Sequence, residues 1–282
     1  MLEISRGWIS IVLKQLIARQ VRAIFDEGKG ETRRVARRSD GLFGPASMAW
    51  RVHGDVTTML VGGVAALLMQ MLHPRVLAGV WDHSSFRADL HGRLRRTARF
   101  IAVTTYGSRA EAEAMIARVC RVHSAIEGST ADGQAYHAQD PELLRWVHAT
   151  EASCFLDAWV RYAAPFTSRP EQDRYFREVA VVAGKLGADE VPLSHRDTRD
   201  YINGMRPQLR ADARTAEIAR LVLTPPQHAA AILPFEMITR AAIDLLPGWA
   251  RRMHGLPDAG LAAPLLTAGT ATVARTVRWA LA

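Results

Sequence analysis

Residues 140–162 read DPELLRWVHATEASCFLDAWVRY, and this stretch decides the fold class. Asp140 can cap a helix N-terminus with its side chain, and Pro141 suits the first helical position because proline lacks the N–H that would be unpaired there. No glycine or proline follows before Tyr162. The stretch therefore predicts a long helix that ends at about Tyr162.

The same helix punctuation recurs along the chain. Ser108 with Glu111 forms a capping-box pattern, and we expect the helix that it opens to stop at Gly128. Stop and start signals predict further helices at 52–72, 170–187, 194–204, 211–223, 235–246 and 265–280. Strand signals are nearly absent. The sequence predicts an all-α protein, with one multi-helix globular domain over residues 45–282.

Residues 1–44 are expected to form an N-terminal arm. An amphipathic helix is predicted at 4–26, with Ile9, Leu13 and Leu16 on its apolar stripe, and a loop follows. This helix could pack on the core or lie on a membrane surface as a peripheral contact. Its apolar run is broken by Lys14 and precedes no small-residue cleavage site, so we expect no signal peptide and a cytoplasmic location, with membrane association left open.

The longest uncharged segment, from Val56 to Pro74, approaches membrane-spanning length. It contains Thr57, Gly62 and Gln70, which favours a buried core helix over a membrane span.

Composition narrows the class of partner. The 282 residues are 49% hydrophobic with a formal charge of +8, and only three of the 36 basic residues are lysine. An arginine bias of this kind is typical of a GC-rich genome, and the basic clusters lack interleaved aromatic residues, so no nucleic-acid partner is expected. Cys120 and Cys154 lie in apolar helical patterns, as free thiols in a reducing compartment do.

Phosphate loops, nucleophile elbows and His-Glu-x-x-His motifs are all missing from the sequence. His123 lies on the apolar stripe of the capped helix, beside Val119 and Cys120. A neutral imidazole in an apolar interior is a suitable axial ligand for haem iron, but it is also what an ordinary core histidine looks like.

Two further groups are candidates. Arg93, Arg96 and Thr97 share one helix face and either converge on an anionic group such as a haem propionate or form a solvated basic face. His148 and Glu151 share another face and either shuttle protons or form a structural hydrogen bond.

Taken in order, several segments resemble the latex-clearing-protein and mpaB-type oxygenases, which are helical b-type haem proteins. The resemblance is clear over about residues 45–165 and rests on the order of the motifs. These are Gln70-Met71-Leu72-His73-Pro74, Val80-Trp81-Asp82-His83-Ser84, Arg93-x-x-Arg96-Thr97, Tyr106-Gly107, Val122-His123 with Gly128, and residues 140–150.

The resemblance implies roles for these residues. His123 matches the proximal ligand of haem b iron, and Arg93 and Thr97 match residues of the haem pocket. His73, which ends the uncharged helix, either binds the cofactor or satisfies the terminal carbonyls of that helix. Arg96 stands at a position where the latex-clearing branch has lysine. Arginine has no lone pair to offer iron, so we expect the sixth coordination position to be open or to hold water.

We therefore expect a haem-dependent oxygenase or oxidoreductase in which Arg93, Arg96, Thr97, His148 and Glu151 serve catalysis. Its substrate would be a small apolar molecule of isoprenoid or lipid-like kind, and its oxidant dioxygen or peroxide, with an unidentified electron donor. The alternative is a non-catalytic helical protein that binds haem or a lipid, either free or peripheral to a membrane.

Overall fold

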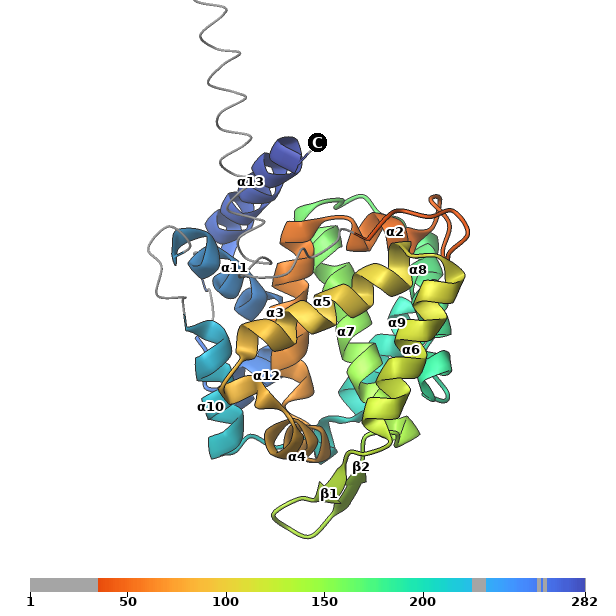
Figure 1. Ribbon diagram of the computed structural model, residues 1–282. Coiled ribbons are helices and arrows are strands. Elements are labelled where there is room, and N and C mark those ends of the chain that lie inside the picture. The colour runs from red at the N-terminus through yellow and green to blue at the C-terminus, as the bar shows by residue number, and fades with distance from the viewer. Residues whose placement is uncertain (1–34, 225–231, 258–259, 261–262, 282) are drawn as a thin grey trace, which may run out of the picture.

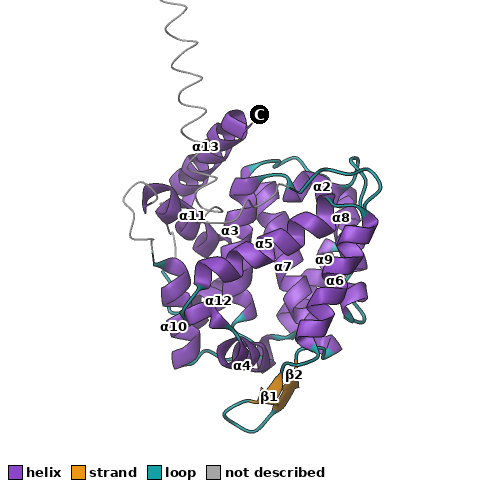
Figure 2. Ribbon diagram, in the orientation of Figure 1, coloured by secondary structure: helices purple, strands orange, loops and turns teal. Residues whose placement is uncertain are grey.

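The computed structural model describes residues 35–224, 232–257, 260 and 263–281. The helix predicted at 4–26, and most of the arm that contains it, lie outside the described residues. The described part is helical apart from loops and one small two-stranded hairpin, which confirms the predicted all-α class (Figures 1 and 2).

The first half of the described chain contains α2 (Met48–His53), α3 (Val56–Gln70), α4 (Pro74–His83), a 3-10 turn at Ser85–Arg87, α5 (Leu90–Tyr106), α6 (Arg109–His123) and the strands β1 (Glu127–Ser129) and β2 (Ala135–His137). The second half contains α7 (Pro141–Tyr162), α8 (Arg169–Leu186), α9 (His195–Gly204), a 3-10 turn at Arg206–Gln208, α10 (Ala213–Leu223), α11 (Ile232–Leu245), α12 (Gly248–Met253) and α13 (Ala263–Leu281).

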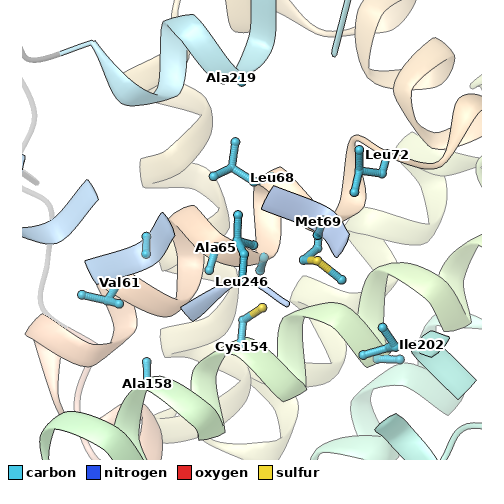
Figure 3. Close-up of a cluster of buried hydrophobic side chains, with 14 of the residues drawn as sticks. Val61, Ala65, Leu68, Met69, Leu72, Cys154, Ala158, Ile202, Ala219 and Leu246 are labelled. Atoms are coloured by element: carbon cyan, nitrogen blue, oxygen red, sulfur yellow. The ribbon is translucent and has the colours of Figure 1, made fainter. Parts of the chain in front are cut away.

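The core forms where α3 packs along α7. In Figure 3, Val61 and Ala65 of α3 lie on the side that faces Cys154 and Ala158 of α7, and all four belong to one cluster of buried apolar residues. The two helices approach closely at Gly62, where an added Cβ would lie 2.8 Å from the backbone oxygen of Cys154. Burial of this apolar surface is the main force that holds α3 in the centre of the domain.

Several helices have the caps that the sequence predicts. The Asp140 carboxylate accepts a hydrogen bond from the backbone N–H of Glu142, and α7 runs to Tyr162 as expected. Both capping-box contacts of Ser108 and Glu111 are present at the start of α6. Gly187 ends α8 with a φ of 103°, the left-handed conformation that glycine adopts without strain.

Two predicted boundaries were wrong. The single helix expected at 52–72 is divided into α2 and α3, because the Asp55 side chain accepts from Thr58 N–H and starts a new helix. The helix expected to reach Gly128 ends at His123, and Gly128 lies in β1. Gly128 is needed there because a Cβ would lie 2.5 Å from the Tyr136 hydroxyl oxygen on β2.

Within the described ranges, no single helix is long and apolar enough to cross a membrane. Only α3 and α4 taken together reach that length and composition, and they are bent by 106° at the break between them. Much of α3 is buried inside the domain.

Candidate active site

A cavity of about 190 Å³ lies among α2, α5, α6, α7 and α8, and we call it the histidine cavity. Its walls are mainly apolar side chains such as Phe100, Ile101, Phe155 and Val179. A smaller set of polar or ionisable side chains lines it from five helices: His53, Thr104, Thr105, His123, His148, Glu151 and Tyr175. A mostly apolar hollow with a few polar groups is the usual form of a small-molecule site.

His123 is the last residue of α6 and lines this cavity. Its Nδ1 atom is buried and has no hydrogen-bond partner. Burial lowers the pKa of the imidazole, and the nearby positive charge of Arg93 lowers it further. His123 is therefore neutral near pH 7 and keeps a ring nitrogen free for a ligand.

His148 and Glu151 lie one turn apart on α7, and both line the same cavity. Burial lowers the pKa of His148 to about 4, and its Nε2 atom has no partner. Burial raises the pKa of Glu151 to about 7, because the apolar surroundings disfavour the carboxylate. Glu151 can therefore hold or release a proton close to neutral pH, as a general acid or base must.

A hydrogen-bonded chain that sequence reasoning missed lies at the α2 side of the cavity. The His53 ring bonds through Nδ1 to the Thr105 hydroxyl at 2.8 Å and through Nε2 to the Tyr175 hydroxyl at 2.9 Å. Burial lowers the pKa of His53 to about 3, so the ring is neutral and one nitrogen donates while the other accepts. The three residues come from α2, α5 and α8, and no local pattern links them.

Arg93 and Thr97 lie on the α5 stripe that continues to Ile101, but neither lines the cavity. Arg93 is partly buried and donates to the Ser84 hydroxyl at 2.5 Å. Burial lowers its pKa, and the charge of Arg96 adds to this. Thr97 is exposed.

Arg96 is also exposed and points its guanidinium toward Asp89, at 3.3 Å. The structure thus brings Arg93 near His123 and leaves Arg96 on the surface beside the start of α5.

His73 lies in a different place. It lines a second cavity of about 360 Å³, which we call the His73 cavity. The His73 ring lies 6.2 Å from that of Trp146, a fully buried residue that precedes Val147 and His148 of the histidine cavity. His73 is therefore not grouped with His123.

No group of three or more histidine, cysteine, aspartate or glutamate side chains that could hold a metal ion is found in the part of the chain that the structure describes. The histidine cavity instead contains His53, His123 and His148, which are half-buried and come from three different helices, among mainly apolar walls.

The family follows from comparison with known proteins. Residues 50–279 match the family described as "ER-bound oxygenase mpaB/B'/Rubber oxygenase, catalytic domain", and the chain belongs to this family. The resemblance drawn from the ordered motifs is thereby confirmed, and the chain is an enzyme of an oxygenase family. Neither the comparison with curated proteins nor the comparison with solved structures found a match.

Proposed function

We propose that this protein is a haem b-dependent oxygenase or oxidoreductase, with His123 as the proximal ligand of the iron. One observation carries the proposal: His123 is neutral and has a buried, unpartnered ring nitrogen in an apolar cavity of an oxygenase-family chain. A buried polar atom without a partner is costly, and a ligand that bonds to it removes that cost.

The residues of the cavity fit haem in their chemistry. Haem iron accepts a neutral imidazole as a ligand, and apolar lining residues such as Phe100 and Phe155 would provide a suitable surface for the porphyrin. The volume of about 190 Å³ is below the roughly 300–1,000 Å³ of most small-molecule sites. Haem uptake therefore requires the walls of the cavity to move apart.

Three residues of α5 contribute charge or hydrogen-bond donors to this function. Arg93 is close enough to influence His123 electrostatically, and its guanidinium would pair with an anionic propionate group of the cofactor. Thr97 provides a hydroxyl one turn further along α5. Arg96 has no lone pair, so it cannot coordinate iron and acts only through its charge.

Two residues of α7 transfer protons. The Glu151 carboxyl, with its pKa raised to about 7, donates or takes up a proton inside the cavity. His148, neutral across physiological pH, accepts a hydrogen bond or a proton at its free Nε2 atom. Bound haem supplies the redox chemistry by which dioxygen or peroxide is activated, and the protein supplies orientation, protons and exclusion of water.

The apolar walls select the substrate class. Most of the surface around the cavity is aliphatic or aromatic, so a small isoprenoid or lipid-like molecule gains binding energy there from burial of its chain. Among the residues that the structure describes, only Glu151 and the histidines contribute acidic or basic side chains to the cavity lining, which disfavours a strongly charged substrate.

Turnover tests the activity. Haem-loaded, reduced protein is mixed with oxygen and a panel of isoprenoid alcohols and fatty acids, and oxygen uptake is recorded beside a His123→Ala control. The proposal predicts substrate-dependent oxygen uptake that the variant lacks. Haem binding without any uptake would favour the non-catalytic carrier instead.

A further inference from the structure

The His73 cavity has features of a second ligand site. It lies between the N-terminus of α4, the turn of the β1–β2 hairpin and the segment after α9, and its volume of about 360 Å³ falls in the range of small-molecule sites. It is larger than the histidine cavity, and the motif that contains His73 has no part in the proposed haem chemistry.

His73 itself points to a missing partner. The residue is 2% exposed, lines the cavity, and has no hydrogen-bond partner at either Nδ1 or Nε2. Burial lowers the pKa of the ring to about 4, so near neutral pH one nitrogen carries a hydrogen to donate. A fully buried imidazole with both nitrogens unpaired is unusual unless a ligand completes it.

Two neighbouring features are electropositive. His73 is the N-cap of α4 but gives no side-chain hydrogen bond to its first turn, which leaves the positive end of the helix dipole facing the cavity region. Arg210 is held beside His73 by the bond from its backbone N–H to the Leu72 carbonyl at 2.8 Å. Its guanidinium donates to the carbonyls of Pro207 and Leu209, and no carboxylate pairs with it in the described part of the chain.

The other charged side chains that line the cavity, Arg75 and Asp132, already have hydrogen-bond partners. The Arg75 guanidinium bonds to Asp140 at 2.8 Å and to Glu142 at 2.6 Å, so these two carboxylates hold it in place at the side of the cavity. Asp132 accepts from the Thr130 hydroxyl and from the Gln134 amide on the hairpin turn. Asp132 and Gln134 can also accept hydrogen bonds from the hydroxyl groups of a ligand.

We propose that the His73 cavity binds a small polar molecule that carries an oxyanion, either a carboxylate or a phosphate, together with hydroxyl groups. The oxyanion accepts hydrogen bonds from the His73 ring, the Arg210 guanidinium and the first turn of α4, and the hydroxyl groups face Asp132 and Gln134. This assigns His73 to a site of its own, which shares no lining residue with the histidine cavity.

Calorimetric titration tests the proposal. The full chain is titrated at constant ionic strength with malate and with glycerol phosphate, which separate the two sources of oxyanion, and with glycerol as the uncharged probe. We expect one of the two anions to bind and glycerol not to bind. If neither anion binds, the proposal is overturned.

Variants locate the binding. Arg210→Gln removes an exposed charge at the cavity and should weaken binding about tenfold or more, as loss of a charge-assisted hydrogen bond does. His73→Phe keeps an aromatic ring, removes both ring nitrogens and should weaken anion binding similarly. Arg220→Gln is the matched control, because Arg220 is exposed on α10 and does not line the cavity.

Unchanged affinity in Arg210→Gln, or an equal loss in Arg220→Gln, overturns the proposal. Arg210→Gln decides the matter by itself if His73→Phe does not fold. His123→Ala should bind the anion as the wild type does, so failure of the haem assignment and failure of this site are distinguished.

Discussion

The contact between α3 and α7 can be tested at a single glycine. In Gly62→Ala, the new Cβ would lie 2.8 Å from Cys154 O, 2.8 Å from Phe155 Cδ1 and 2.9 Å from Phe155 Cα. Two of these atoms are backbone and cannot rotate away, so the helices must separate. Overpacking of this kind costs about 1–3 kcal/mol, and three contacts below 3.0 Å favour the upper end. Alanine regains about 1 kcal/mol of helix propensity, which leaves a net loss of about 2 kcal/mol.

The adjacent glycine provides the control. A Cβ at Gly63 meets only Phe155 Cε1 at 3.7 Å, an ordinary contact, so Gly63→Ala should stabilise the fold by about 0.5–1 kcal/mol. Urea unfolding followed by circular dichroism measures both free energies. Because about 1 kcal/mol moves the melting temperature of a domain this large by about 2–4 °C, thermal scans should separate the two variants clearly. If Gly62→Ala is as stable as Gly63→Ala, the packing of α3 on α7 is not as described.

Two further predictions concern the candidate site, and a third concerns the N-cap of α3. His123→Ala should lower the haem retained after gel filtration about tenfold or more, whereas His148→Ala should retain it; the opposite result would make His148 the ligand. The free energy of unfolding of Glu151→Gln relative to that of the wild type should increase from about pH 4.5 to about pH 7. In the wild type the Glu151 carboxyl has a pKa raised from 4.5 to about 7, so its ionisation over this range destabilises the folded state. Urea unfolding at several pH values measures the difference, and a difference that stays constant would contradict this reasoning. Asp55→Ala should destabilise the protein by about 2 kcal/mol, because it removes the cap of α3 and the partner of Arg278, while Asp55→Asn should lose less; equal melting temperatures for the two variants would refute the capping role.

Local capping chemistry explains why much of the fold was predictable. Asp140-Pro141 and the Ser108/Glu111 box act within a few residues, so their sequence pattern is sufficient to place α7 and the start of α6. The hairpin at 127–137 was missed because each strand has only three residues and depends on the Tyr136 hydroxyl, which bonds to Asp82 of α4 at 3.0 Å.

The candidate site was less accessible to sequence reasoning. His123, His148 and Glu151 were found because each lies on an apolar helix face. His53 and Tyr175 are separated by 122 positions and meet only through the packing of α2 on α8. His73 resembled the others in sequence, and only the folded chain shows that it lines a separate cavity.

We expect the histidine cavity to take up haem on His123. An absorption spectrum of the purified protein is the most direct test of this proposal. The protein is expressed with added haem precursor, purified, and recorded before and after reduction and addition of carbon monoxide. If His123 holds haem, the protein shows a Soret band that corresponds to near-stoichiometric haem, and the position of this band shifts when carbon monoxide is added. A protein that shows no Soret band even after reconstitution with haem would contradict the account.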